Sequence, residues 1–585
     1  MFGYQNKVLR IDLTKKATTM EPLNMDWAEK YIGAKGLAIK YLYEELKPGI
    51  DPLSPDNKLI LMNGPLTGTP VPCSGKLAIA AKSPATGTIL DCSIGGHAAL
   101  KIKYAGYDAV IFEGKLSEPG YVLIQDGKIE FKDASWLWGK GSHEAEALLV
   151  DKYGHEASVL SIGPAGENLV TMSCINSDYY RQAGRGGIGA VMGSKNVKAI
   201  VVIGTGGVKV PNIVEVTAKL SEILREDTVS EDNMFIYDCG TTAFLEACND
   251  GGILPKRNFS DTTDEEWTKY NGEVLLGNKV GKRGCGSCGL GCGNFLKIGD
   301  AICEGPEYES IAVAGPNAGI TDPEAIVKAN QVADDMGLDT ISAGDTIIFA
   351  MEMTEKGIHD FGIRFGNKEK YIEYLKLMAR REGVGADLAL GVKKLSEKYG
   401  GQDFAMHVKG LEYPQYEPRG SWGMSLAYAV SDRGACHMRA YAPNEEVFAA
   451  SIPPYTPEGK GEMVYNLAIY NAVKFSLVIC DFWPLSIERM AEVMTMITGK
   501  EWTVDELNAV AARVIHLARA FNQREGFNRK DDTMPKRLVN EALKSGPAAG
   551  QKIPQEAFED MLDQYYDVLG WSRDGIVPES ILCTL

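Results

Sequence analysis

Two patterns of hydrophobic residues divide the chain near residue 208. Before that point, short apolar runs such as KLAIAAKSP, AVIFEG and AIVVIG alternate with turns rich in Gly and Pro. Runs of this length between turn residues are typical of β-strands, so the sequence predicts sheets in this part. After Pro211 the apolar residues recur at the spacing of a helical face, as in NIVEVTAKLSEILRE and TVDELNAVAARVIHLARAFNQREG. This second pattern predicts helices.

The predicted fold class is therefore α+β, with a β-rich N-terminal domain over residues 1–208 and two mainly α-helical domains over residues 209–405 and 406–585. A chain of 585 residues is long enough for two to four domains of ordinary size. One helix start is marked clearly, because Thr321-Asp322-Pro323-Glu324 has the form of a capping box with proline just inside it.

Composition and charge exclude several classes of function. With 61 basic and 78 acidic side chains the net charge is −17, whereas a sequence-independent nucleic-acid surface needs an excess of basic residues. No stretch approaches the roughly 18 unbroken apolar residues that a membrane helix needs. The start of the chain lacks the basic and apolar regions of a secretion signal. We therefore expect a cytoplasmic protein that binds neither nucleic acid nor membrane.

Three of the cysteines crowd into one glycine-rich segment, KRGCGSCGLGCGNF. Cys285, Cys288 and Cys292 are spaced C-x2-C-x3-C, and the glycines let the backbone wrap closely around a bound group. Thiols at this spacing are typical of a metal or cluster loop, holding either a structural zinc ion or a [4Fe–4S] cluster. Both groups need a fourth ligand from elsewhere. The candidates are Cys303, Cys436 and Cys480.

Two further glycine-rich segments lie in the first domain. One runs from Ser93 to His97 and contains Gly95 and Gly96, and the other, QAGRGGIG, carries Arg185 between glycines. Such loops either hold a phosphate against backbone N–H groups or make tight turns. Neither has the spacing of a Walker A or a Rossmann motif, so both interpretations stay open.

Taken together, these motifs are similar to those of the aldehyde ferredoxin oxidoreductases. The matching stretches span most of the chain and include LRIDLT, GPLTGTPVPCSGK, AGRGGIGAVMGSKNVKAI, CGSCGLGC, CEGPEYE, DDMGLD and SDRGACHMRA. The resemblance implies a tungsten (or molybdenum) ion held by two pyranopterin dithiolenes beside one [4Fe–4S] cluster. It also implies that the first domain forms a saddle-like base, with the cofactor between this base and the two helical domains.

The resemblance extends to the residues that hold these groups. The family's pterin motif, D-x-x-G-L-(C/D), is matched in full by Asp334-Asp335-Met336-Gly337-Leu338-Asp339. The second copy, residues 475–480, has Phe475 in place of the aspartate and Val478 in place of the glycine. The implied cluster ligands are Cys285, Cys288, Cys292 and Cys480. The implied cofactor contacts are Lys76, Ser93, Gly95, Gly96, Ala183, Gly184, Arg185, Gly186, Asp334, Gly337, Leu338, Asp339, Arg439 and Ile479.

Several of these positions depart from the family pattern. Lys76 stands where the family commonly has an arginine that bridges pterin and cluster, and lysine keeps the charge without the planar fork. Ser93 stands where an asparagine helps to bind the Mg²⁺ that joins the two pterin phosphates, and the Ala183 carbonyl matches the other magnesium ligand. Arg439 replaces a typical lysine, so the positive charge is retained.

By the same resemblance, the catalytic acid/base pair is Glu309 and His437, with Glu307 as the alternative carboxylate. The implied reaction adds the oxygen of water to a small aldehyde, giving a carboxylic acid. Two electrons then pass through the cluster to ferredoxin or to an iron–sulfur partner subunit. Such a reaction needs a proton acceptor and a donor that polarises the carbonyl group.

The electron-transfer partner would dock near the cluster. Lys279, Lys282 and Arg283 flank the cysteine segment and are candidates for this contact, although a solvated basic patch is the alternative. Homo- and hetero-oligomers both remain open. Two other functions compete: a ring-reducing aryl-CoA reductase on the same scaffold, and a non-catalytic protein stabilised by zinc.

Overall fold

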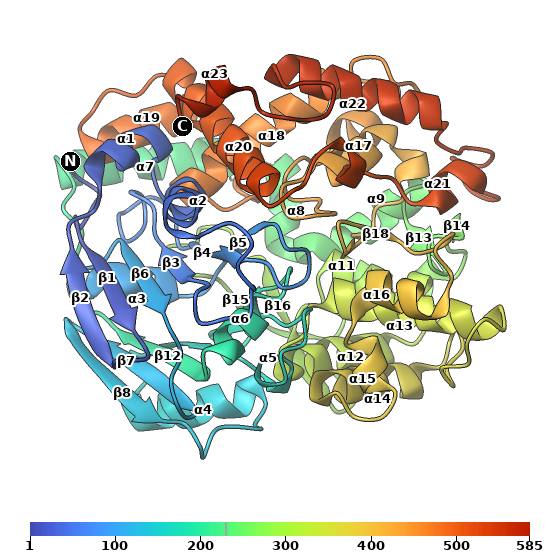
Figure 1. The fold of residues 1–585 in the computed structure, drawn as a ribbon, viewed down its shortest axis with the longest axis horizontal. Helices are drawn as coiled ribbons and strands as arrows, with labels where there is room; N and C mark the ends of the chain where they lie inside the picture. Colours follow the sequence, from blue (N-terminus) through green and yellow to red (C-terminus); the bar gives the residue numbers. More distant parts are fainter. Residues whose placement is uncertain (229–230) are drawn as a thin grey trace.

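The computed structural model describes residues 1–228 and 231–585. Figure 1 shows the sheets of the N-terminal domain at the left, the helices of the middle region at the lower right, and the C-terminal helices across the top. The order is a β-rich region followed by helical regions, which confirms the predicted fold class.

Two six-stranded sheets form the N-terminal domain. Their strand orders are β2-β1-β6-β3-β4-β5 and β11-β10-β9-β12-β7-β8. The strands are β1 (Val8–Asp12), β2 (Ala17–Glu21), β3 (Leu59–Met62), β4 (Leu77–Lys82), β5 (Ile89–Ile94), β6 (Ala109–Glu113), β7 (Gly120–Gln125), β8 (Lys128–Asp133), β9 (Ser158–Ser161), β10 (Ile175–Ser177), β11 (Arg181–Ala183) and β12 (Val197–Ile203). The three apolar runs named above form β4, β6 and β12, as predicted.

The two sheets share one hydrophobic core. Ile79 of β4 and Val110 of β6, from the first sheet, lie in the same buried cluster as Val122 of β7, Leu160 of β9 and Ile200 of β12. All five side chains are fully buried. Strands covered on both faces are apolar at successive positions, which explains the continuous apolar runs in the sequence.

Helix α2 (Ala34–Glu45) joins the N-terminal domain to the C-terminal helices. It packs against β4 on one side and against α18 (Lys460–Leu477) and α20 (Val504–Arg524) on another. Leu42 of α2, Val473 of α18 and Leu517 of α20 belong to one buried cluster. Segments from opposite ends of the sequence therefore share a core, and this packing fixes the end of α18 against the base.

The middle region is mainly helical but contains a small antiparallel sheet of order β15-β16-β17. Its strands are β15 (Lys279–Arg283), β16 (Gly293–Ile298) and β17 (Ala301–Glu304). The main helices here are α11 (Tyr308–Ala312), α12 (Pro323–Met336), α13 (Thr340–Glu355) and α14 (Lys368–Arg380). The cysteine-rich segment is the connection between β15 and β16.

Helix α12 starts where the sequence indicates a start, but with a different cap. The N-cap is Asp322, whose carboxylate accepts hydrogen bonds from the backbone N–H groups of Glu324 and Ala325 at 3.0 and 3.4 Å. The sequence motif placed the cap at Thr321, and this prediction is wrong by one residue, because the cap is Asp322. Pro323 takes the first helical position, where its fixed φ suits the helix and its missing N–H costs nothing.

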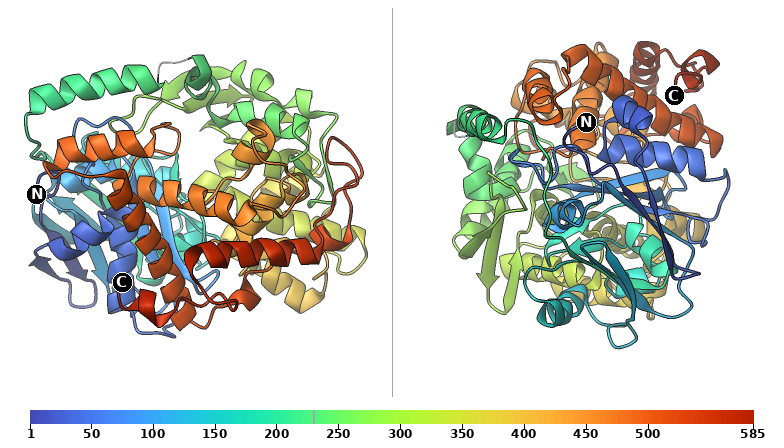
Figure 2. Two further views of the ribbon diagram at one scale, coloured as in Figure 1. Left: turned by 90° about the horizontal axis from the view of Figure 1, so that it is seen from above. Right: turned by 90° about the vertical axis from the view of Figure 1, so that its left-hand side faces the viewer.

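The C-terminal region also contains α17 (Trp422–Val430) and α22 (Gln555–Leu569). Figure 2 shows α7 (Ile213–Thr228) lying along α19 (Ile487–Thr498) in the view from above. The other helices are α1 (Met25–Tyr31), α3 (Ala98–Tyr104), α4 (Ser142–Tyr153), α5 (Pro164–Glu167), α6 (Ile188–Ser194), α8 (Glu231–Cys239), α9 (Phe244–Asp250), α10 (Gly272–Leu276), α15 (Gly385–Leu388), α16 (Gly391–Tyr399), α21 (Lys536–Asn540) and α23 (Glu579–Leu582). Across the two described ranges, no helix has the length and apolar character to cross a bilayer.

Candidate active site

A cavity of about 300 Å³ lies where the base, the small sheet and the helices meet. It brings together residues that are far apart in the sequence and that the resemblance singled out. These are Lys76, Ser93, Gly95, Gly184, Cys285, Cys292, Glu307, Glu309, Asp334, Leu338, Asp339 and Cys480. The other candidates lie outside this lining: Gly96, Ala183, Arg185, Gly186, Cys288, Gly337, His437, Arg439 and Ile479.

The cysteine loop packs directly on the first glycine segment. A Cβ atom added to Gly95 would lie 2.6 Å from the Cys285 sulfur, so no other residue fits there without a shift. The N–H of Gly286 donates to the carbonyl oxygen of Gly96 at 2.9 Å. These two glycines therefore permit the close approach of the cysteine loop to the base.

Cys480 lies beside this loop although it is far away in the sequence. Its backbone N–H donates to the Cys73 carbonyl at 2.8 Å, and the Cys73 N–H donates to the Ser287 carbonyl at 2.6 Å. The two other candidates for a fourth ligand do not line the cavity. Cys303 is buried in β17 and its thiol faces the Val327 carbonyl, and Cys436 accepts from the Arg433 guanidinium at 3.0 Å.

The two groups considered for the thiols need different spacings of the sulfur atoms. Zinc–sulfur bonds of about 2.3 Å in a tetrahedron place the sulfur atoms about 3.8 Å apart. Within the residues that the structure describes, no three His, Cys, Asp or Glu side chains are arranged to hold one metal ion. A [4Fe–4S] cube needs wider spacing, because each thiolate binds a different iron.

The first pterin motif forms the junction between α12 and α13. Gly337 ends α12 in the left-handed conformation with φ of 74°, and Asp339 is the N-cap of α13. Asp334 is 5% exposed, and burial raises the pKa of its carboxyl well above the ordinary value. The Gln182 side chain donates to it at 2.5 Å. Asp334 and Asp339 both face the cavity, whereas Gly337 lies behind it.

Arg185 is buried beneath this junction. Its guanidinium pairs with Asp339 at 3.2 Å and donates to the carbonyl oxygens of Ala435 and Glu412 at 2.6 and 2.5 Å. These partners satisfy its charge within the protein. Arg185 therefore positions Asp339 and joins the base to the C-terminal region, rather than lining the cavity.

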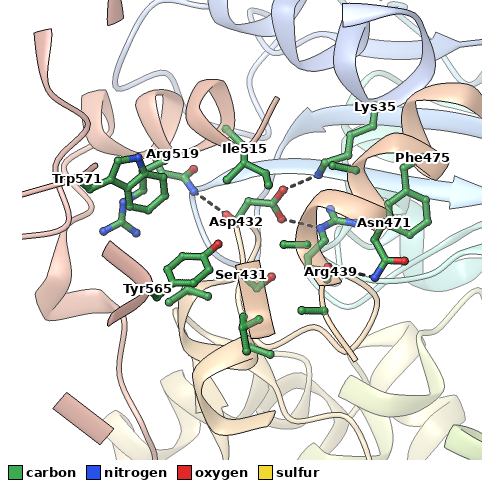
Figure 3. Close-up of a pocket in the computed structure, with 18 residues that line it drawn as sticks. Lys35, Ser431, Asp432, Arg439, Asn471, Phe475, Ile515, Arg519, Tyr565 and Trp571 are labelled. Atoms are coloured by element: carbon green, nitrogen blue, oxygen red, sulfur yellow. Dashed lines mark hydrogen bonds and ion pairs between the residues drawn. The ribbon is translucent and has the colours of Figure 1, made fainter. Parts of the chain in front are cut away.

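The second motif closes α18. Val478 follows the helix in the left-handed conformation with φ of 66°, Ile479 is fully buried, and Cys480 reaches the cavity. Phe475 faces away from that cavity and lies under the Arg439 guanidinium, 5.7 Å from ring centre to the arginine carbon. Both line a separate small cavity of about 50 Å³ with Asn471 (Figure 3).

Arg439 belongs to a closed network of four buried charges. Lys35 contacts Asp91 and Asp432 at 2.7 and 2.5 Å, and Arg439 contacts the same two carboxylates at 2.6 and 2.8 Å. Figure 3 shows Asp432 between the two cations. The network joins α2 and β5 of the base to residues after α17. With both cations satisfied, Arg439 is held firmly in place.

A second pair of charges stands beside the cluster loop. Lys76 forms an ion pair with Asp481, the residue directly after Cys480. Burial disfavours the charge on Lys76, but Asp481 and the Cys480 thiol outweigh it and raise the pKa. Arg181 pairs with Glu304 across the same cavity. No motif in the sequence singles out Asp481, Arg181 or Glu304, although Asp481 adjoins a predicted ligand.

Glu309, which lines the cavity, faces His437, which lies outside its lining. His437 Nδ1 lies 3.5 Å from Glu309 Oε1, and neither atom has a hydrogen-bond partner among the described residues. Glu309 Oε2 accepts from the Gln415 N–H at 2.8 Å. Burial raises the pKa of Glu309 to about 8 and lowers that of His437 to about 3. Two unsatisfied polar atoms so close together fit a site that handles a proton.

Three tyrosine rings that no motif in the sequence indicates lie next to His437. The Tyr416 ring lies 5.7 Å from the His437 ring, stacks on Tyr308 at 4.9 Å and meets the edge of Tyr441 at 4.8 Å. The only signal in the sequence is that each tyrosine lies close to a candidate or to its partner Gln415. The rings place apolar surface on the side of His437 that Tyr416 faces.

Fold and site together are those of an oxidoreductase in which a glutamate and a histidine stand near a cysteine-rich loop. The sequence pattern described as "Aldehyde ferredoxin oxidoreductase, N-terminal domain" matches residues 8–204, and that of domains 2 and 3 matches residues 215–585. The chain therefore belongs to the aldehyde ferredoxin oxidoreductase family.

Similar proteins cover the whole chain. The tungsten-containing aldehyde ferredoxin oxidoreductase of Pyrococcus horikoshii is 38% identical over 100% of this chain and 98% of its own length. The WOR-like subunit of an aliphatic sulfonate oxidoreductase from Pyrococcus furiosus is 31% identical over 100% and 97%. Among solved structures, the active site complex BamBC of benzoyl coenzyme A reductase with 1,5-dienoyl-CoA matches with a TM-score of 0.85 and 25% identity, covering 100% of this chain and 97% of that one.

Proposed function

We propose that this protein oxidises a small aldehyde to a carboxylic acid with a tungsten (or molybdenum) bis-pyranopterin. Electrons would leave through one [4Fe–4S] cluster to ferredoxin or to an iron–sulfur subunit in the cytoplasm. The observation that carries the proposal is one cavity lined by Glu309, Cys285, Cys292 and Cys480. The oxidation needs an acid/base group and an electron relay side by side. The family and the names of the relatives support the same chemistry.

The cavity also offers groups that suit the cofactor. The Asp334 carboxyl can accept N–H groups from a pterin edge, and Gly184 leaves open space, since an added Cβ would meet nothing nearer than Asp339 at 3.9 Å. The Ser93 hydroxyl and the Ala183 carbonyl are oxygen ligands of the kind that Mg²⁺ prefers. When bound, the tungsten centre would accept two electrons and the cluster would release them singly.

Glu309 and His437 would handle the protons of the reaction. An aldehyde and water give a carboxylate, three protons and two electrons, so a base is needed at the reacting carbon. The Gln415 N–H holds Glu309 Oε2, which leaves Oε1 free to take a proton. His437 stays neutral above its lowered pKa of about 3 and can donate an N–H to the carbonyl oxygen.

The electron exit would lie at β15. Lys282 stacks over the Tyr237 ring at 3.4 Å and donates to the Gly291 carbonyl of the cysteine loop at 3.2 Å. Val280 is 62% exposed beside it, and Tyr237 is 42% exposed. A basic and apolar surface of this kind next to the loop suits an acidic electron carrier.

The test uses anaerobically purified holoenzyme, an aldehyde panel and a viologen dye. Glu309→Gln should keep the tungsten and iron content but lower kcat about 10²–10⁴-fold, the usual contribution of an acid/base group. Wild-type kcat/KM should rise as pH increases through about 8, because the basic form of Glu309 then becomes populated. Unchanged aldehyde oxidation by Glu309→Gln would show that Glu309 is not the catalytic acid/base group.

Glu307→Gln is the matched control. Glu307 lines the same cavity two residues away, but its carboxylate accepts from the Thr241 hydroxyl. We expect this variant to keep most of the activity. Loss of activity in Glu307→Gln alone would move the catalytic role to Glu307.

The second candidate function is reduction of an aryl-CoA thioester ring. It is favoured by the solved benzoyl coenzyme A reductase complex, which matches this chain along its full length. The same holoenzyme is assayed with benzoyl-CoA and a low-potential donor. Turnover of the thioester without aldehyde oxidation would favour this candidate over the first.

A further inference from the structure

The carboxylate of Glu309 is held by a buried segment that has no regular secondary structure. Residues 413–417 lie between β19 (Leu411–Glu412) and the 3₁₀ turn Pro418–Gly420, and all five are buried. The N–H of Gln415 in this segment is the group that donates to Glu309 Oε2 at 2.8 Å. Because neither a helix nor a sheet fixes these residues, their place beside Glu309 depends on the side chains that bind them.

The backbone of Gln415 is bound on both sides to the start of α11. Its N–H donates to Glu309, and its carbonyl accepts from the Tyr308 hydroxyl at 2.5 Å. Tyr308 and Glu309 are successive residues, so the two contacts align Gln415 along α11. With Oε2 bound in this way, the other oxygen of Glu309 lies 3.5 Å from His437 Nδ1.

The side chain of Gln415 is anchored from the opposite direction. Its Nε2 donates to Asp345 Oδ1 of α13 at 2.9 Å and to the Tyr413 carbonyl at 3.2 Å. Its Oε1 accepts from the Asn317 amide at 3.0 Å, and the same amide donates to Asp345 Oδ1 at 3.3 Å. Gln415 and Asn317 are fully buried, and Asp345 is 1% exposed. Every hydrogen-bonding group of Gln415 therefore has a partner, which fixes the residue in one place.

Asp345 contributes the shared acceptor of this network. Its Oδ1 accepts both amides, whereas its Oδ2 is buried and has no hydrogen-bond partner among the described residues. Neither Asp345 nor Gln415 lines the cavity that Glu309 lines. Their route to a substrate in that cavity is therefore through the Glu309 carboxylate.

We propose that Asp345 is a positioning residue that acts through Gln415 to hold Glu309 with Oε2 bound and Oε1 directed at His437. The inference rests on the proposed function, because it needs Glu309 to act on the substrate. A general base works only within hydrogen-bond reach of the proton that it takes. Loss of the acceptor on α13 would let residues 413–417 shift and carry Glu309 away from that position.

The experiment measures kcat and KM per tungsten atom in anaerobically purified holoenzyme, with acetaldehyde and benzaldehyde as substrates and benzyl viologen as acceptor. Asp345→Ala should lower kcat by up to about 10²-fold, the effect of a displacement of about 1 Å. KM and the tungsten and iron contents should stay at the wild-type values, because Asp345 does not line the cavity. Asp345→Asn keeps an oxygen acceptor in place of Oδ1 and should restore most of kcat.

A second variant tests whether Asp345 acts through Gln415. Gln415→Met has a side chain of similar length without the donor, and it should lower kcat with KM unchanged. It also replaces Asp345→Ala if that variant does not accumulate. The double variant should be no slower than the slower single variant, since both changes remove the same hydrogen bond. Effects that multiply would show that Asp345 acts by another route and would overturn the inference.

Thr346→Ala is the matched control. Thr346 is the next residue of α13 and is fully buried, but its hydroxyl donates to the Ser342 carbonyl of the same helix at 2.7 Å. We expect its kcat to equal that of the wild type. An equal fall in Thr346→Ala and Asp345→Ala would overturn the inference, since loosening of α13 would then explain both.

Two other results would also count against the inference. An unchanged kcat per tungsten atom in Asp345→Ala, with less folded protein, would mean that the network only stabilises the fold. A kcat as low in Asp345→Asn as in Asp345→Ala would mean that the carboxylate does more than accept the amide. Both results leave the proposed function intact, whereas a tungsten-loaded wild type that oxidises neither aldehyde would overturn the proposed function as well.

Discussion

The two pterin motifs have the same backbone conformation, although only the first keeps the family residues. In both, a left-handed residue follows the helix, and the N–H of the next residue bonds to a carbonyl five positions back. Leu338 bonds to Ala333 at 2.9 Å, and Ile479 bonds to Lys474 at 3.0 Å. Each is a Schellman ending in which the next residue is a buried hydrophobe. The glycine and leucine of the motif therefore serve the backbone, and the first and last residues are free to serve the site.

The difference between the two motifs shows that packing in the core can stabilise a left-handed residue that is not glycine. Gly337 suits its left-handed conformation, but Val478 adopts the same one at a cost of about 1–3 kcal/mol. Val478 is buried and its methyl group faces Gly64, where an added Cβ would lie 3.0 Å from it. Burial in the core between α18 and the base thus offsets the strain. In the first copy, no space exists for such a side chain.

The largest expected effect distinguishes the last residues of the two motifs, Asp339 and Cys480. Cys480→Ala should lose the cluster, because a cube with three protein thiolates is incomplete, and iron content and the cluster signal should fall together. Asp339→Ala should keep the iron but destabilise the fold by about 3 kcal/mol, since it removes the α13 cap and leaves Arg185 without its carboxylate. Full iron in Cys480→Ala would contradict the ligand assignment.

The next effect distinguishes the stability contributions of the two left-handed residues, Gly337 and Val478. Gly337→Val should destabilise the protein by at least about 3 kcal/mol, because the new Cβ would lie 2.7 Å from the Gly163 nitrogen in addition to the left-handed strain. The reciprocal Val478→Gly should change stability by no more than about 1 kcal/mol, because relief of strain offsets the loss of a buried side chain. Urea midpoints of both variants measure this, and equal losses would contradict it.

The third comparison concerns the first positions of the two motifs, where the expected effect is a change in the pH dependence of stability. Burial raises the pKa of Asp334 in the folded state, so the folded protein holds a proton that the unfolded chain releases above about pH 4. This contribution to stability is complete below that pH and is lost as pH rises toward the folded pKa, by at most about 1.4 kcal/mol per pH unit. Asp334→Asn should remove this slope from urea midpoints measured between pH 4 and 8.

Phe475→Leu is the control for this prediction. Position 475 carries no titratable group, so the pH dependence of its variant should parallel that of the wild type. If Asp334→Asn keeps the wild-type slope, the buried carboxyl of the first motif does not titrate as its surroundings indicate.

The sequence predicted the strands of the base better than those of the middle region. All six residues of β4 are buried, and two-sided burial produces the unbroken apolar run that marks a strand. The strand β15 has the sequence KVGKR and is only partly buried, so it carries no such run. β15 and β16 pair because they lie on either side of the cysteine loop. No local pattern in the sequence reveals this pairing.

For the site, spacing identified the cysteine loop but not its remote partner. Cys303, Cys436 and Cys480 were equivalent on local evidence, and only the resemblance to a family separated them. What distinguishes Cys480 is that the end of α18 packs on the base beside the loop, a tertiary feature. The same holds for the contacts of Arg185 and Cys73, whose partners lie in other parts of the chain.

The placement of the thiols also dictates when a nascent chain can complete the cluster site. The cysteine loop and Cys480 are 195 residues apart, counted from Cys285 (480 − 285). At ribosomal speeds of about 5–20 residues per second, the last thiol is synthesised roughly 10–40 s after the first. On the proposed ligand set, a cube delivered earlier would meet three sulfur atoms and an open corner, so its insertion would wait until Cys480 has been synthesised.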